Sequence, residues 1–226
     1  MMKRIMAFAF TFFLLLPFGY AATRSDNPTQ STHGPLYVGL LIQDNLPNVT
    51  TDTNVYREFI RSLPKGTHIA VGYARPGSVD LAVPFTEDLD KAASEFRAPA
   101  GFARMAPGSP FITAKEFIKK FPADTNAQRL LIFVSDGIDS NFGDFSTPYE
   151  GNPYLTSAVS TAKKNNVRVD TIFAPSARTR GSFLTSVGQG TLNYLSQKTG
   201  GVGYYSGSIY VSAQPFLEKI LKQITP

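Results

Sequence analysis

Two aspartates and one serine stand where the chain leaves, or enters, apolar segments. Asp44 follows the apolar run 36–42, and Asp136 follows the run 130–134. Ser109 precedes a segment expected to be a helix. Carboxylate and hydroxyl oxygens are the ligands that a hard divalent cation such as Mg²⁺ prefers. If the two runs are parallel strands, their carboxyl ends meet at one edge of a sheet, where ligands usually bind. The three side chains therefore indicate a candidate cation site.

Each of these side chains also has a purely structural interpretation. Aspartate at a strand end often caps the following turn, which would account for Asp44. Ser109 before Pro110 is explained by N-capping, because proline is favoured at the first helical position. Asp136-Gly137 is a common turn pair. The residue types alone leave both interpretations open.

Alternating apolar and amphipathic segments predict the elements that would position these residues. Strands are expected, in order, at 36–42, 68–74, 79–85, 130–134, 167–174 and 202–205. Helices are expected at about 54–63, 86–96, 109–121, 153–166, 192–199 and 212–224, with a loop at 175–190. Pro76-Gly77 suits the centre of a hairpin turn. This order favours one α/β domain, with a doubly wound, mostly parallel six-stranded sheet, one antiparallel edge strand and helices on both faces.

The beginning of the chain lies outside that pattern. Two basic residues precede an uncharged, largely apolar stretch, and Ala21 supplies a small residue at a position that signal peptidase reads. We therefore expect a signal peptide at 1–21, a flexible leader at 22–34 and the folded domain at 35–226. The apolar stretch is shorter than a membrane-spanning helix requires, and an uncleaved N-terminal anchor is the alternative. The expected product is exported, periplasmic or secreted, and not stably inserted in a membrane after cleavage.

The composition argues against several classes of site. The chain has no cysteine, which excludes disulfides, thiol nucleophiles and thiolate metal sites. Its two histidines, His33 and His68, argue against a multi-histidine metal site. The formal net charge is +5, and the basic residues are spread along the chain, so we expect no nucleic-acid patch.

The motifs of common enzymes are also missing from the sequence. There is no Gly-x-Ser-x-Gly elbow and no Gly-x-x-x-x-Gly-Lys-Ser/Thr phosphate loop. Gly188-Gln-Gly190 lacks the third glycine of a dinucleotide fingerprint. His68 is expected at the sheet edge opposite Asp44 and Asp136, which argues against a Ser-His-Asp arrangement. We therefore expect a protein that is not an enzyme, with a metal-dependent hydrolase as an alternative.

The order of the expected elements resembles the von Willebrand factor type A (vWA) family over about residues 36–224. The segment 133–137 (FVSDG) is similar to the Thr-Asp-Gly segment at a strand end of that family. The segment 194–201 (YLSQKTGG), followed by a short aromatic strand, resembles a group of exported bacterial vWA proteins. The resemblance implies a Rossmann-like fold and a metal ion-dependent adhesion site.

In that family the adhesion site uses Asp-x-Ser-x-Ser, a threonine from a later loop and an aspartate after the fourth strand. The first motif maps onto residues 44–48, where Leu46 and Asn48 replace the two serines. The implied ligands of Mg²⁺ or Mn²⁺ are Asp44, Asn48, Ser109 in place of the threonine, and Asp136. Because leucine offers no oxygen, the site is degenerate. Either a water replaces the missing hydroxyl, with weaker metal binding, or the site is vestigial.

Three loops, at 97–108, 138–151 and 175–190, are expected around the same edge. They carry aromatic, methionine and arginine side chains, which are the types enriched at interface cores. These candidates are Phe102, Met105, Phe142, Phe145, Tyr149, Arg178 and Arg180. The alternative is that the aromatic residues pack the loops onto the domain.

Together with the resemblance, these loops predict an exported, non-enzymatic module that binds a protein partner in adhesion or assembly. The alternative is a metal-independent structural or assembly protein with a vestigial site.

Overall fold

The computed structural model describes residues 34–100, 108–123, 126–143, 149–177, 179–205 and 212–225. The chain divides into two units, 1–32 and 33–226, and the described residues all belong to the second. The expected signal peptide, and the leader up to residue 33, lie outside the described residues. Within the described ranges, no helix is both long enough and apolar enough to cross a membrane.

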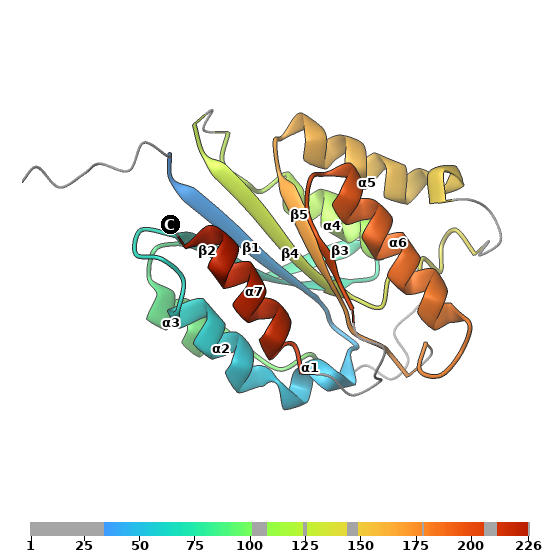
Figure 1. Cartoon of the computed structure of the whole chain (residues 1–226), viewed down its shortest axis with the longest axis horizontal. Helices are drawn as coiled ribbons and strands as arrows, with labels where there is room; N and C mark the ends of the chain where they lie inside the picture. Colours follow the sequence, from blue (N-terminus) through green and yellow to red (C-terminus); the bar gives the residue numbers. More distant parts are fainter. Residues whose placement is uncertain are drawn as a thin grey trace, which may run out of the picture. The chain divides into compact units, whose positions relative to one another are not determined.

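A six-stranded sheet with the order β3-β2-β1-β4-β5-β6 forms the centre of the second unit (Figure 1). All neighbouring strands pair in parallel except β2 and β3, which are antiparallel. The predicted sheet, with one antiparallel edge strand, is therefore confirmed. The strands are β1 (Leu36–Gln43), β2 (His68–Arg75), β3 (Ser78–Thr86), β4 (Gln128–Ser135), β5 (Arg168–Phe173) and β6 (Gly203–Tyr204).

The antiparallel edge arises from the predicted Pro-Gly turn. Arg75 and Ser78 are paired at the end of the hairpin, which leaves Pro76 and Gly77 as its two turn residues. Gly77 has a φ of 72°, a conformation that glycine adopts without the steric penalty of a Cβ atom. The turn thus reverses the chain after β2 instead of allowing a parallel crossover.

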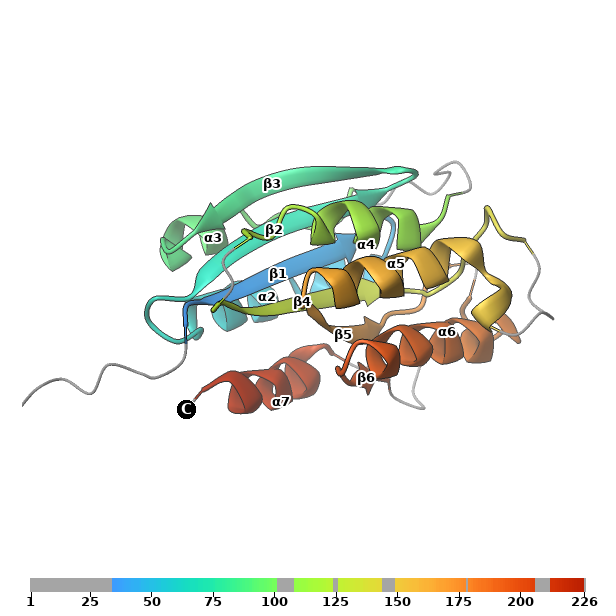
Figure 2. The ribbon, with the colours of Figure 1, turned by 90° about the horizontal axis from the view of Figure 1, so that it is seen from above.

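Helices cover both faces of the sheet (Figure 2). Alternate strand residues point to opposite faces, and they join two separate buried clusters. Leu40 and Ile132 pack in the cluster that includes α2, α3 and α7, whereas Leu41 and Phe133 pack with α4, α5 and α6. The helices are α1 (Pro47–Thr51), α2 (Thr53–Arg61), α3 (Leu89–Glu95), α4 (Pro110–Ile118), α5 (Pro153–Lys164), α6 (Leu184–Lys198) and α7 (Gln214–Ile224), with a 3-10 turn η1 (Tyr149–Gly151) before α5.

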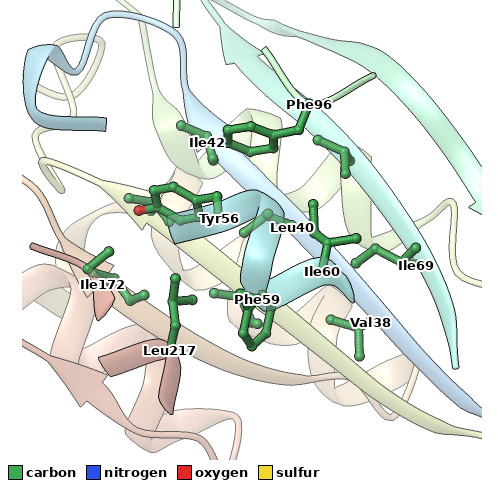
Figure 3. Packing of buried hydrophobic residues seen from close by; sticks show 14 of the residues in the cluster. Val38, Leu40, Ile42, Tyr56, Phe59, Ile60, Ile69, Phe96, Ile172 and Leu217 are labelled. Carbon is green, nitrogen blue, oxygen red and sulfur yellow. The ribbon is translucent and has the colours of Figure 1, made fainter. Parts of the chain in front are cut away.

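The packing of α2 shows how the helical and strand periodicities combine. Tyr56, Phe59 and Ile60 form the buried face of this helix, and Figure 3 shows them over the β1 side chains. Tyr56 stacks on Phe96, with 5.3 Å between the ring centroids. Fully burying a large apolar side chain stabilises the fold by roughly 1.5–3 kcal/mol, so this face fixes the helix against the sheet.

The predicted loop at 175–190 and the short helix at 192–199 are wrong, because α6 already begins at Leu184. The error comes from Gly188 and Gly190, which lie inside the helix. A Cβ atom on Gly188 would collide with the carbonyl oxygen of Asp136, and one on Gly190 would collide with the hydroxyl of Tyr149. The two glycines permit close packing of the helix and do not interrupt it.

Two further boundaries differ from the prediction near the first two helices. An additional short helix, α1, precedes α2 and places a proline in its first turn, where proline is well tolerated. The next helix begins at Leu89 and not at Thr86, because Thr86 is still part of β3, where it pairs with Ile69 of β2. Asp88 then caps α3, since its Oδ1 accepts a hydrogen bond of 2.9 Å from the N–H of Lys91.

Candidate functional site

Asp44 follows β1 at the carboxyl edge of the sheet, and its side chain is fully buried. Its backbone N–H donates a hydrogen bond of 3.0 Å to the carbonyl oxygen of Ala74 in β2. Gln43 pairs with Ala74 in the parallel register of the two strands. The next residue of β2, Arg75, is therefore placed beside Asp44.

Both carboxylate oxygens of Asp44 accept hydrogen bonds from positively charged or backbone donors. Oδ1 accepts from Nη1 of Arg97 (2.8 Å) and from the N–H of Ala100 (2.8 Å). Oδ2 accepts from Nη2 of Arg97 (3.1 Å) and from Nε of Arg75 (3.1 Å). A carboxylate has about four acceptor positions, so these donors account for its capacity.

A second carboxylate, Asp80, completes what we call the Asp44 cluster: Asp44, Arg75, Asp80 and Arg97. Oδ2 of Asp80 lies 2.7 Å from Nη2 of Arg75 and 3.1 Å from Nη2 of Arg97. The cluster contains two cations and two anions, so its formal charges cancel. It joins the end of β1, the β2–β3 hairpin and the segment after α3.

The ring of Tyr73 holds Arg97 in place. The guanidinium carbon lies 3.7 Å from the ring centroid, a cation–π geometry. The Tyr73 hydroxyl donates to the carbonyl oxygen of Arg97 (2.6 Å) and accepts from its backbone N–H (2.9 Å). Burial raises the pKa of Tyr73 to about 12, so this hydroxyl keeps its proton at neutral pH.

The arginines also determine the charge state of Asp44. Burial alone would raise the pKa of this carboxyl group, but the hydrogen bonds from Arg97, the Ala100 amide and Arg75 lower it below its ordinary value of 3.8. The pKa of Arg97 is raised in turn, chiefly by its hydrogen bond to Asp44. Both groups are therefore charged at neutral pH.

The other predicted aspartate, Asp136, forms part of a turn at the end of β4. Its Oδ1 accepts a hydrogen bond of 3.1 Å from the N–H of Ile138, as in an Asx-turn. Oε1 of Gln43 accepts from the Ser135 hydroxyl (2.6 Å) and from the N–H of Asp136 (3.1 Å). Gln43, which the sequence did not single out, thus links the ends of β1 and β4.

Ser109 caps α4 as predicted, and it also contacts an aspartate that the prediction missed. Its Oγ accepts from the N–H of Ile112 (3.4 Å) and donates to Oδ2 of Asp139 (2.8 Å). Asp139 is buried and also accepts from Nδ2 of Asn152, the N-cap residue of α5 (3.1 Å). Asp139 therefore connects the loop after β4 to the starts of α4 and α5.

These contacts do not fit a magnesium ion held by Asp44. Magnesium requires near-octahedral oxygen ligands, whereas both oxygens of Asp44 already face guanidinium groups. Leu46 is fully buried in the core and supplies no oxygen. Asn48 lies in α1, and its side chain is outside the part that the structure describes. Among the described residues, no group of three or more His, Cys, Asp or Glu side chains could hold a metal ion.

Of the predicted partner-binding residues, three are described: Phe142, Tyr149 and Arg180. Phe142 is half-buried, and Arg180 is exposed before α6. Tyr149 is 38 % exposed and packs on Tyr194, with 6.0 Å between the ring centroids. The structure adds Phe183, which is 72 % exposed at the start of α6. The other four candidates, Phe102, Met105, Phe145 and Arg178, lie outside the described residues.

No protein-family model and no curated protein matches the chain. Solved structures of similar fold include BatB, a conserved hypothetical protein from Bacteroides thetaiotaomicron, with a TM-score of 0.60, 12 % identity, and 84 % of this chain and 97 % of that chain covered. The pilus adhesin SpaC from Lactobacillus rhamnosus GG has a TM-score of 0.57 and 12 % identity, with 86 % of this chain and 31 % of that chain covered.

A von Willebrand factor type A protein from Catenulispora acidiphila is also similar, with a TM-score of 0.54 and 16 % identity. The alignment covers 85 % of this chain and 43 % of that chain. Identities this low establish the fold and leave the activity open. The strand order, the antiparallel edge strand and these similarities together show that the chain has a vWA-like α/β fold.

Proposed function

We propose that this chain is an exported, non-enzymatic protein-binding module whose carboxyl edge is held together by the Asp44 cluster without a metal ion. The observation that carries the proposal is that both carboxylate oxygens of Asp44 already accept hydrogen bonds, which come from Arg75, Arg97 and the Ala100 amide. Export is the part of the proposal that rests on the sequence of residues 1–21.

The Asp44 cluster supplies what a cation would supply at this edge. A buried carboxylate needs compensating charge and hydrogen bonds to remain ionised. Arg75 and Arg97 provide both, and they also cross-link three segments that lie far apart in the sequence. A metal ion would have to displace these guanidinium groups before it could reach the oxygens of Asp44.

The side chains available for a partner lie on the same edge, because α5 and α6 begin where β4 and β5 end. Phe183 projects from a loop that is braced by hydroxyl groups. The Thr185 hydroxyl donates to the carbonyl oxygen of Thr179 (2.6 Å), and the Thr179 hydroxyl accepts from the N–H of Ser176 (2.9 Å). An exposed aromatic residue on an ordered loop loses little conformational entropy on binding, which favours a role as an anchor.

Two further observations support a binding function over catalysis. His68, the only histidine among the described residues, pairs with Glu87 (3.2 Å) at the opposite edge of the sheet. It therefore lies away from the serine and aspartates of the carboxyl edge. The similarity to a pilus adhesin is in keeping with a binding module.

A photo-crosslinking phenylalanine analogue at position 183 tests the proposal in cells that produce the chain. The matched control carries the same analogue at Val202, which is 42 % exposed and precedes β6 at the opposite edge. We expect a discrete protein adduct from position 183, none of that size from position 202, and no change when a chelator is added.

Three results would contradict parts of the proposal. If neither position gives an adduct, the partner-binding role of this edge is wrong. If both positions give the same adduct, the contact is not specific to this edge. If the chelator removes the adduct, a metal ion takes part and the metal-assisted alternative is correct.

A further inference from the structure

A pocket of about 400 Å³ opens at the amino-terminal edge of the sheet, opposite the Asp44 cluster. Its walls come from the starts of β1, β4 and β5 and from the ends of α5, α6 and α7. The volume falls within the range of small-molecule sites, which is roughly 300–1,000 Å³. The pocket therefore has room for a ligand larger than a single inorganic ion.

All the described charged side chains that line this pocket are cationic. Arg129, Lys163, Arg168 and Lys198 line it, and no aspartate or glutamate is among its described lining residues. Arg129 is nearly buried, and its Nε donates to the carbonyl oxygen of Pro122 (2.9 Å). Like charges gathered around one cavity create a positive potential, which attracts anions.

Arg168 offers a specific hydrogen-bond donor in addition to charge. Its Nη2 contacts Oδ2 of Asp170 at 3.1 Å, and Asp170 also accepts from the N–H of Val202 (3.0 Å). The buried Asp170 carboxylate holds the Arg168 guanidinium in place and compensates one of the four positive charges that line the pocket. Nε of Arg168 is buried and has no hydrogen-bond acceptor within the part of the chain that the structure describes. A buried donor without an acceptor is unfavourable, and the exposed part of this side chain, 34 % of its surface, is what the pocket offers to an anion.

The rest of the pocket lining is part apolar and part neutral polar. Its apolar surface comes from the partly exposed side chains of Leu36 and Ile224, because Leu130, Ala162 and Val167 are almost fully buried. A bare inorganic anion would leave this surface unused, whereas a ligand with an organic portion would cover it. The pocket thus offers cationic groups for an anion, and neutral polar and apolar groups for an organic portion.

We propose that this pocket binds a phosphate group carried on a small organic moiety, with the phosphate among Lys163, Arg168 and Lys198. Arginine and lysine are the usual partners of phosphate oxygens. The phosphate could belong to a soluble phosphorylated compound or to a phospholipid headgroup. The proposal is independent of partner binding at the opposite edge.

A structural role for the lysines is the alternative. Lys163 and Lys198 lie in the last turns of α5 and α6, where cations interact favourably with the helix dipole. That role accounts for the two lysines but for neither the cavity nor the unpaired Nε of Arg168. The two explanations differ in what they predict for added phosphate compounds.

Calorimetric titration of the full chain with glycerol 3-phosphate tests the proposal, together with sedimentation with phosphatidylglycerol vesicles. The test variant is Lys163→Gln/Lys198→Gln, whose two lysines are exposed. The matched control is Lys65→Gln/Lys91→Gln, which removes the same charge from exposed positions outside the pocket. We expect saturable binding that weakens about tenfold in the test variant and changes less than about twofold in the control.

The two probes distinguish the source of the phosphate. Saturable binding of glycerol 3-phosphate supports a soluble ligand, and binding of vesicles alone supports a lipid headgroup, provided that the test variant weakens either one selectively. The proposal is overturned if neither probe binds, or if the test and control variants lose binding equally, since that would show non-specific attraction to surface charge.

Discussion

Arg97 donates two hydrogen bonds to the carboxylate of Asp44, of 2.8 and 3.1 Å. The aspartate is completely buried, whereas the arginine side chain is 35 % exposed. Arg97 therefore separates the carboxylate from solvent while it stays partly hydrated itself, which limits its own desolvation penalty. With Tyr73 beneath its guanidinium, Arg97 explains how a buried aspartate is stabilised at this edge by protein groups alone.

The first prediction concerns removal of the buried charge. Asp44→Asn should lower the free energy of unfolding by about 2–4 kcal/mol, because the amide group turns an N–H donor toward the guanidinium groups and leaves the two cations of the cluster with one anion, Asp80. Urea unfolding followed by circular dichroism measures the change. Asp80→Asn is the control, since Asp80 contacts the same two arginines but is 38 % exposed.

For Asp80→Asn we expect a loss of at most about 1 kcal/mol, as for other solvent-exposed ion pairs. Equal losses in the two variants would contradict the central position of Asp44 in the cluster.

The second prediction concerns pH. The pKa of Asp44 is lowered on folding, so the ionised group stabilises the fold above its ordinary pKa of 3.8, and this contribution is lost as the pH falls through the folded pKa. The difference in unfolding free energy between the natural chain and Asp44→Asn should therefore narrow at acidic pH.

Burial raises the pKa of Asp170 despite the pairing of this residue with Arg168. Its effect on the pH dependence of stability is therefore opposite to that of Asp44. Asp170 is present in both proteins, so its effect cancels in the difference. Urea unfolding from neutral pH down to the acid range gives the measurement. A difference that stays constant or widens with falling pH would show that Asp44 is not the group that titrates.

The sequence predicted the sheet well because its strands are either doubly buried or joined by a strong turn signal. The runs at 36–42 and 130–134 are continuous and apolar, and each became a central strand. The Pro-Gly turn identified the antiparallel hairpin. The start of α6 was missed because glycine is a poor helix former, and only the three-dimensional contact with Asp136 shows why Gly188 lies in the helix.

The candidate site was predictable in its position but not in its chemistry. The ends of the apolar runs and the Ser-Pro pair placed Asp44, Asp136 and Ser109 at strand and helix ends, where the structure has them. These patterns could not reveal Arg97, which is 53 residues from Asp44 along the chain and comes beside it only through the fold. One signal was available for Arg75, since it ends the strand that pairs with β1 and so had to lie near Asp44.

The third prediction tests the close packing of α6. In an exposed helix, replacing glycine by alanine usually stabilises the fold by about 1 kcal/mol. Gly188→Ala should instead destabilise it by about 2–3 kcal/mol, because the new methyl group collides with the carbonyl oxygen of Asp136 and the helix must shift. Thermal and urea unfolding measure the sign.

Gln189→Ala, in the same turn of the helix but half-buried, is the control and should change stability by less than about 0.5 kcal/mol. Stabilisation by Gly188→Ala would show that the helix does not approach the Asp136 turn as closely as the structure has it.

The last prediction concerns metal ions. Titration of the full chain with Mg²⁺ or Mn²⁺ should give no saturable heat at millimolar metal and no shift in melting temperature, because the oxygens of Asp44 are already bound by guanidinium and amide donors. The melting temperature is a sensitive readout, since a ligand at 100 times its Kd stabilises the folded state by about 2.7 kcal/mol.

Asp136→Ala serves as the matched variant, because Asp136 belongs to the predicted metal ligands but lies outside the Asp44 cluster. Saturable binding by the natural chain that this variant loses would mean that the arginines can move aside for a cation. The carboxyl edge would then work as a metal-assisted site, and an acidic group on the partner would be expected to complete the coordination. Binding that persists in Asp136→Ala would place the ion elsewhere, and the edge would remain held by its arginines.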